Sequence, residues 1–167
     1  IGHYEVDLEH PGRDRTRGRI WRIVPPGKPH APLELSSPSK TAPSLGSGNL
    51  TRRLLAMNHL ADTIGQPAIP ALRGQLANPS AAPFAAWALQ RLGALTDEEL
   101  ARLAAGRTEL EQVHAVRLLA ARPAWSGAQR QWLLDSLKAK NPHVRRAAAA
   151  TLGGRPHASQ LRPLLAA

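Results

Sequence analysis

The ends of the longer predicted helices recur at a nearly constant interval through most of the sequence. They fall at Gly65, Gly93, Arg122 and Gly153, in steps of 28, 29 and 31 residues, and a shorter helix is predicted within each step. One helix pair cannot bury its apolar faces alone, so pairs that repeat in this way stack on their neighbours. The interval therefore predicts a mainly α fold, with an α-solenoid of about four antiparallel helix pairs over residues 49–167.

Local signals predict where several of these helices begin. The segments Thr96–Glu99 and Ser126–Gln129 have the spacing of a capping box, in which the side chains at both ends bond to opposite backbone amides. Asn141 followed by Pro142 is typical of a helix start, because Asn accepts from the first turn and Pro suits the first helical position. These signals indicate helix starts at three separate places in the chain.

Apolar periodicity predicts which side chains face the core. In the first long helix, residues 50–64, the predicted core stripe comprises Leu50, Leu54, Met57, Ala61 and Ile64. In the later helices the residues expected to be buried are Leu89, Leu92, Val144, Ala147, Ala148, Thr151 and Leu152.

The segments before this helical region have a different character. Residues 1–24 alternate like two short strands around a turn, which predicts a β-hairpin, and an isolated hairpin is only marginally stable in water. In residues 25–48, Pro, Ser and Gly supply 14 of the 24 residues, a composition that predicts a linker without tight packing. The chain is thus expected to contain a hairpin, a linker and a helical region.

Composition excludes several kinds of chemistry. Hydrophobic residues make up 43% of the chain but aromatic residues only 4%, which favours closely packed, alanine-rich helices. There is no cysteine, so the chain can form no disulfide, zinc–thiolate site or covalent haem attachment. No apolar run approaches the roughly 20 residues that a transmembrane helix needs.

The positive charge raises nucleic acid as a partner. The net charge is +10 and the pI is about 11.5. The cations are scattered as single arginines and two pairs, and acidic residues nearly balance them in the first 30 residues. This distribution favours a solvated surface over a nucleic-acid interface.

Two segments carry resemblances to known families. Residues 141–153, Asn-Pro-His-Val-Arg-Arg-Ala-Ala-Ala-Ala-Thr-Leu-Gly, resemble the second helix of a HEAT repeat. The segment from Gly2 to Ile23, with His10-Pro11, Arg13-Asp14 and Arg17-Gly18-Arg19-Ile20-Trp21, is similar to the end of the β-propeller in PVC-type bacterial membrane-bound dehydrogenases. Residues 49–58 extend this second similarity.

The dehydrogenase resemblance implies a place for this chain in a longer protein. It implies an oxidoreductase in which a sugar-dehydrogenase-like propeller precedes HEAT repeats and often a cytochrome c domain. The resemblance also implies a location in the periplasm or cell envelope, although a cytoplasmic location is not excluded. The propeller body and a Cys-x-x-Cys-His motif are absent from this sequence. Haem c therefore belongs elsewhere in such a parent protein, and this chain is expected to hold no cofactor. His3 and Arg13 would border a substrate site only in an intact propeller, and no motif assigns them a role.

Two hypotheses about function follow. The first is a non-catalytic HEAT-repeat scaffold that docks protein modules of its own or a partner chain. The alternative is a basic HEAT array that grips nucleic acid along one face, which requires a continuous stripe of cations. The alternating arginines near the start of the chain fit the propeller strand better than a nucleic-acid arm.

No residue is assigned a catalytic, cofactor-binding or metal-binding role. His59 and His114 lie on predicted helices without the spacing of metal ligands, and we interpret both as surface or groove residues. The run Asp97-Glu98-Glu99 falls in the first turn of a helix, where carboxylates interact favourably with the helix dipole.

Tryptophans and arginine pairs are the remaining candidate binding groups. Trp87, Trp125 and Trp132 fall one per helical unit; they suit either ligand stacking or packing between repeats, and packing is favoured. The pairs Arg52-Arg53 and Arg145-Arg146 suit either phosphate binding or bonds to neighbouring helix ends, and the second interpretation is favoured.

Overall fold

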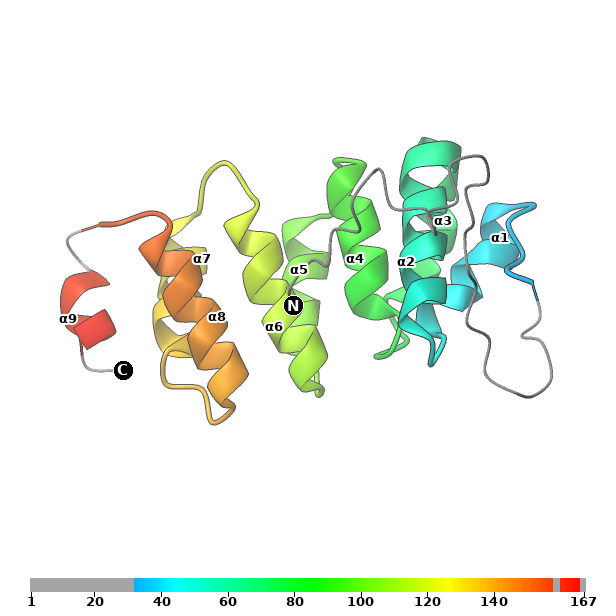
Figure 1. Ribbon diagram of the computed structural model, residues 1–167. Coiled ribbons are helices and arrows are strands. Elements are labelled where there is room, and N and C mark those ends of the chain that lie inside the picture. Colours follow the sequence, from blue (N-terminus) through cyan, green and yellow to red (C-terminus); the bar gives the residue numbers. More distant parts are fainter. Residues whose placement is uncertain (1–31, 158–159, 166–167) are drawn as a thin grey trace, which may run out of the picture. The chain divides into compact units, whose positions relative to one another are not determined.

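The computed structural model describes residues 32–157 and 160–165. The chain divides into two units, residues 1–31 and 32–167, and the described residues belong to the second unit. These residues are mainly helical and contain no β-strand (Figure 1). The hairpin predicted for residues 1–24 lies outside the described residues.

Part of the expected linker, residues 38–46, packs on the helices that follow, which corrects the sequence-based prediction for that part. Residues 38–46 form the short helix α1 (Pro38–Thr41) and a 3₁₀ turn (Ala42–Gly46). Thr41 and Leu45 are fully buried, and the Thr41 hydroxyl donates to the carbonyl oxygens of Glu34 and Ser37. Apolar contacts with the following helices stabilise this segment in a packed conformation. The Pro- and Ser-rich composition reflects only the local conformational preference of the chain, so it did not predict this packing.

The predicted core stripe of the first long helix is correct in its second half only: Ala61 is buried and Met57 and Ile64 pack against the core, whereas Leu50 and Leu54 do not. It consists of α2 (Leu50–Asn58) and a π-helical segment (His59–Ile64), and it ends at Gly65, whose φ is 73°. Leu50 is 55% exposed and Leu54 is also exposed, whereas Ala56, Leu60 and Ala61 are buried. Apolar residues occur on more than one face of this helix, so periodicity alone could not select the packed face.

Three helix pairs follow along the chain. The first comprises α3 (Ile69–Gln75), preceded by the 3₁₀ turn Gln66–Ala68, and α4 (Ala82–Arg91). The next two pairs are α5 (Asp97–Ala104) with α6 (Glu109–Ala120), and α7 (Gly127–Ser136) with α8 (Pro142–Gly153). The short helix α9 (Leu161–Leu165) ends the described part.

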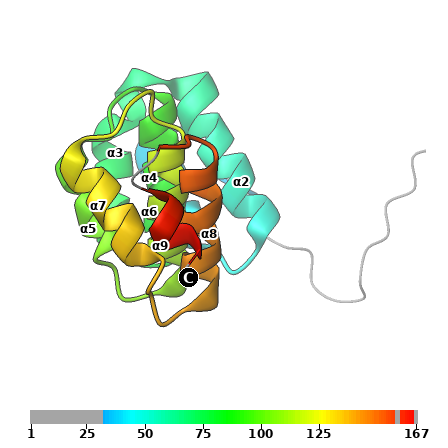
Figure 2. The ribbon, with the colours of Figure 1, turned by 90° about the vertical axis from the view of Figure 1, so that its left-hand side faces the viewer.

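The helices are arranged in two layers. The helices α2, α4, α6 and α8 contact one another in succession, and Figure 1 shows them side by side. We call them the α4 layer. Each of α3, α5 and α7 packs on the α4-layer helix that follows it, and Figure 2 shows α5 and α7 on one side of α6 and α8.

The predicted helix starts are confirmed. Thr96 with Glu99, and Ser126 with Gln129, form capping boxes, and the Asn141 side chain accepts from the backbone amide of His143. A further capping box begins α6. There Glu111 is buried and accepts from the Thr108 amide at 2.9 Å and from the Thr108 hydroxyl at 2.7 Å.

The apolar core runs through both layers. Of the residues predicted to be buried in the later helices, Leu89, Val144, Ala147, Ala148, Thr151 and Leu152 are buried, and Leu92 is half-buried. Leu118 and Leu119 of α6 are fully buried, and α6 contacts α4, α5 and α8. The many alanines let the helix axes approach closely.

Candidate functional site: the groove between α6 and α8

A groove of about 630 Å³ lies along the surface between α6 and α8. Its walls come from one face of each helix, because the lining residues repeat at the spacing i, i+3, i+4 and i+7. They are Leu110, Val113, His114 and Arg117 of α6, and His143, Arg146, Ala147 and Ala150 of α8, with Glu109 also lining the groove.

Two cations in this groove have no partner among the residues that the structure describes. Arg117 and Arg146 are exposed, and neither makes a hydrogen bond or an ion pair in the described residues. The Glu109 carboxylate, in contrast, accepts from Asn141 Nδ2 at 2.9 Å and lies 3.7 Å from His143 Nε2. The groove therefore presents positive charge that no described residue neutralises.

His114 contributes a hydrogen-bond donor, because its neutral imidazole is held in one tautomer. Trp87 Nε1 donates to His114 Nδ1 at 2.8 Å, and an indole N–H can only donate. The neutral imidazole therefore carries its proton on Nε2. Burial lowers the pKa of His114, and the positive charge of Arg117 lowers it further, which favours the neutral ring.

The depressed pKa of His114 predicts a loss of stability in mild acid. Below about pH 6.5 the unfolded chain protonates this histidine while the folded chain resists protonation, so the free energy of unfolding falls as the pH falls. We expect His114→Gln to flatten this dependence, measured by urea unfolding at a series of pH values. An unchanged slope in His114→Gln would contradict the assignment.

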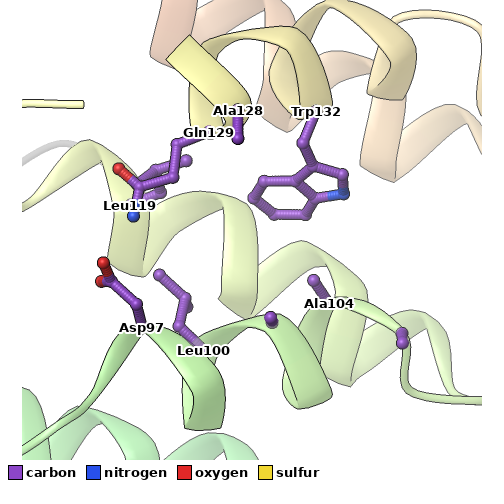
Figure 3. Close-up of a pocket in the computed structure, with 9 residues that line it drawn as sticks. Asp97, Leu100, Ala104, Leu119, Ala128, Gln129 and Trp132 are labelled. Atoms are coloured by element: carbon purple, nitrogen blue, oxygen red, sulfur yellow. The ribbon is translucent and has the colours of Figure 1, made fainter. Parts of the chain in front are cut away.

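A second groove, of about 320 Å³, lies between α5 and α7 (Figure 3). Its polar rim is already engaged, because Asp97 pairs with Arg122 and Gln129 accepts from the Ser126 amide. The rest of its lining is apolar and comprises Leu100, Ala101, Ala104, Ala105, Leu119, Ala128 and Trp132. This groove offers apolar surface but no unpaired charge.

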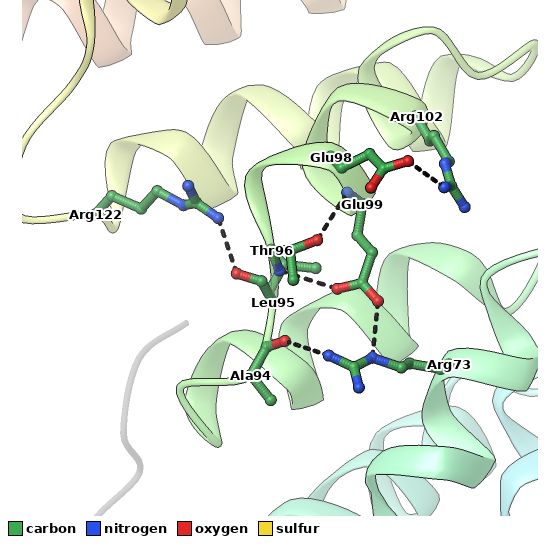
Figure 4. A network of polar contacts seen from close by, with 8 residues as sticks. All are labelled: Arg73, Ala94, Leu95, Thr96, Glu98, Glu99, Arg102 and Arg122. Atoms are coloured by element: carbon green, nitrogen blue, oxygen red, sulfur yellow. Dashed lines mark hydrogen bonds and ion pairs between the residues drawn. The ribbon is translucent and has the colours of Figure 1, made fainter.

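The acidic run that opens α5 is fully paired, as expected for a structural role. Asp97 pairs with Arg122 and Glu98 with Arg102. Glu99 accepts from Arg73 Nε and from the Thr96 amide, both at 2.9 Å (Figure 4). Burial raises the pKa of Glu99, but the Thr96 backbone hydrogen bond and the Arg73 guanidinium outweigh this, so the pKa lies below its ordinary value.

An arginine at or just after the end of each of the last three α4-layer helices bonds back to earlier parts of the chain. Arg91 Nη1 donates to Asn58 Oδ1 at 2.8 Å, and this arginine also pairs with Asp62. Arg122 Nη2 donates to the Leu95 carbonyl oxygen at 3.1 Å, as Figure 4 shows. Arg155 Nη2 donates to the carbonyl oxygens of Ala120 and Arg122. We call Arg91, Arg122 and Arg155 the arginine series.

Among the described residues, the two arginine pairs behave as expected at Arg52 and Arg145, which bond to backbone carbonyl oxygens, but not at Arg53 and Arg146. Arg52 Nη2 donates to the Pro32 carbonyl oxygen at 3.4 Å, and Arg53 lies 4.9 Å from the centre of the Phe84 ring. Arg145 Nη1 donates to the carbonyl oxygens of Ala139 and Lys140, each at 2.9 Å. Arg146 makes no such bond within residues 32–157 and 160–165, and so the expected bond to a neighbouring helix end is not found there.

The tryptophans pack within the protein, as expected. Trp87 of α4 bonds to His114 of α6 and so links neighbouring helices of the α4 layer. Trp125 Nε1 donates to the Leu119 carbonyl oxygen at 2.8 Å, and Arg130 and Arg155 lie 5.6 and 4.9 Å from its ring centre. Trp132 is half-buried against the core.

The other histidines singled out in the sequence have separate surroundings. His59 Nε2 lies 3.0 Å from the Leu35 carbonyl oxygen and so ties the π-helical segment to the residues before α1. His3, like Arg13, lies outside the described residues. The sequence alone did not point to Arg117 and Leu110. Their i, i+7 spacing places them on one face of α6, but the groove exists only because α8 packs beside that face.

Three searches complete the description of the site. In residues 32–157 and 160–165, no group of three or more His, Asp or Glu side chains could hold a metal ion. None of the helices in that part of the chain has the length and apolar character that a membrane span needs. Comparison with protein-family models, with curated proteins and with solved structures finds no match.

Proposed function

We propose that this chain is a non-catalytic, HEAT-like scaffold that docks a protein module on its α4 layer. In this proposal the helix pairs are successive repeats of a solenoid, and the chain belongs to a larger bacterial dehydrogenase of the propeller–HEAT–cytochrome c type. The parent protein performs the oxidation, and haem c sits in another of its domains. The resemblance that motivates this assignment also places the protein in the periplasm or cell envelope.

The observation that carries the repeat proposal is the arginine series. Arg91, Arg122 and Arg155 follow one another at steps of 31 and 33 residues, close to the helix-end interval in the sequence. Each bonds to residues between 27 and 35 positions earlier in the chain. A bond that recurs at the same place in successive helix pairs is what a stacked repeat array requires, since each repeat contacts only its neighbours.

The groove between α6 and α8 supports the docking proposal. It combines an exposed apolar side chain, Leu110, with two cations, Arg117 and Arg146, that have no acceptor in the described part of the chain. Protein interfaces typically combine apolar contact with hydrogen-bonding groups, and arginine is enriched in them.

The alternative function, nucleic-acid binding, is favoured by the net charge and by Arg117 and Arg146. Against it, the other cations of the α4 layer are engaged: Arg91 pairs with Asp62, and Arg53 lies over Phe84. Glu109 adds a negative charge to the same groove. Phosphate backbones need a continuous row of available cations, so we favour the protein partner.

Photo-cross-linking in the native host separates the two functions. We would introduce p-benzoylphenylalanine singly at Leu54, Leu110 and Ala150, which belong to α2, α6 and α8, and at Lys138 after α7 as the control. A discrete, protease-sensitive adduct from at least one α4-layer position, and none from Lys138, is the expected result. A nuclease-sensitive adduct, or no adduct from any α4-layer position, would contradict the scaffold proposal.

A further inference from the structure

We infer that the groove between α6 and α8 binds an acidic peptide segment of a protein partner, with its carboxylates on Arg117 and Arg146. This inference rests on the proposed scaffold function and names the chemistry of the docked segment.

The groups of the groove that have no partner among the described residues favour an anion as ligand. Arg117 and Arg146 are always protonated, and neither has an intramolecular acceptor in the described part of the chain. His114 adds an Nε2–H donor, because its Nδ1 is occupied by the Trp87 indole. Carboxylates match this set well, since a guanidinium binds one through two parallel hydrogen bonds.

The apolar part of the groove favours a peptide over a bare anion. Leu110 is 37% exposed although it is a large apolar side chain, and Val113 lies in the next turn of α6. On the opposite wall Ala147 and Ala150 are small, which leaves space above them. An apolar side chain of the partner can fill that space against Leu110 while acidic neighbours reach the arginines.

The position of Glu109 gives the groove a direction. Glu109 and Arg117 are eight residues apart on α6, which is about 12 Å along the helix axis. The Glu109 carboxylate repels acidic side chains at its own end, beside Leu110. Arg146 lies one turn along α8 from His143, so the bound segment places its apolar residues near Leu110 and its acidic residues from Arg146 onward to Arg117.

This asymmetry also disfavours nucleic acid. A phosphate backbone carries its charge at uniform spacing, so it would bring negative charge to Glu109 as well as to the two arginines. It would also leave Leu110 without an apolar partner.

Binding of a peptide of known sequence tests the inference. The probe is fluorescein-labelled Leu-Ala-Leu-Ala-Glu-Asp-Glu-Glu, titrated with the full chain and followed by fluorescence anisotropy at about 50 mM salt. We expect Arg117→Ala with Arg146→Ala to weaken binding about tenfold or more, because two charge-assisted contacts are lost. The matched control removes two exposed cations outside the groove, Arg107→Ala with Lys138→Ala, and should change binding by less than about twofold.

A charge-swap variant distinguishes loss of the binding contacts from loss of folding, because an unfolded variant would not gain binding to a peptide of opposite charge. The double variant Arg117→Glu with Arg146→Glu should bind the probe in which every acidic residue is lysine, and it should reject the acidic probe. Both arginines are exposed without internal bonds in the described residues, so thermal unfolding of these variants should match the wild type.

Several results would overturn the inference. They are no binding of the acidic probe, equal loss in the control pair, or no response to the charge swap. Tighter binding of a DNA duplex of about 12 base pairs, lost in the same groove variants, would replace it with nucleic-acid recognition. A protein cross-link on the α4 layer together with no acidic-peptide binding would leave the scaffold proposal standing and remove only this inference.

Discussion

Replacing Leu118 with alanine is expected to lower the free energy of unfolding by about 2–5 kcal/mol. Leu118 is fully buried in α6, the helix that contacts α4, α5 and α8. The substitution removes buried methyl groups and leaves a cavity that rigid neighbours on three sides cannot close. Urea unfolding followed by circular dichroism measures the change.

Leu110→Ala in the same helix is the matched control for that prediction. The same groups are removed, but from a side chain that is already 37% exposed, so the loss should be less than about 1 kcal/mol. Similar losses for the two variants would mean that α6 does not lie at the centre of the core.

The second large effect is expected at Arg122. Its side chain is only 13% exposed, pairs with Asp97 and donates to the Leu95 carbonyl oxygen. Arg122→Met keeps much of the apolar stem but removes the charged donor to the partly buried Leu95 carbonyl oxygen and the ion pair with Asp97, which should cost about 1–3 kcal/mol. The measurement is again the free energy of unfolding in urea.

An exposed ion pair supplies the control for Arg122. Arg102 pairs with Glu98 one turn away, and its side chain is 73% exposed. Water screens such a pair, so Arg102→Met should cost less than about 0.5 kcal/mol. If both substitutions have equally small effects, the bonds from Arg122 to Leu95 and Asp97 contribute nothing to stability.

The features that sequence predicted correctly are those set by neighbouring residues. The capping boxes at Thr96 and Ser126 and the start at Asn141 depend on side chains within one turn. The capping box at Thr108 has the same sequence signal, Thr-Glu-Leu-Glu, and could have been found in the same way. Helix starts are therefore readable from this sequence without knowledge of the packing.

The features that sequence missed depend on distant contacts. The packed face of α2 is selected by the 3₁₀ turn and α4, which contact it, and so Leu50 is exposed while Ala56 is buried. Leu45 is buried because helices that come later in the chain cover it, although its Pro- and Ser-rich surroundings indicate a linker. The α6–α8 groove brings together residues 33 positions apart, such as Leu110 and His143, and no local pattern reports that.

Hydrogen–deuterium exchange on Arg122→Met tests the central claim, a scaffold of stacked repeats, most directly. In a repeat array each unit is stabilised by its neighbours, so protection should fall most in α5 and α6 and least in α2. Peptide-resolved mass spectrometry of the wild type and the variant gives this profile along the chain. A graded loss of protection centred on α5 and α6 is the predicted result; an equal loss from α2 to α8 would contradict the repeat array.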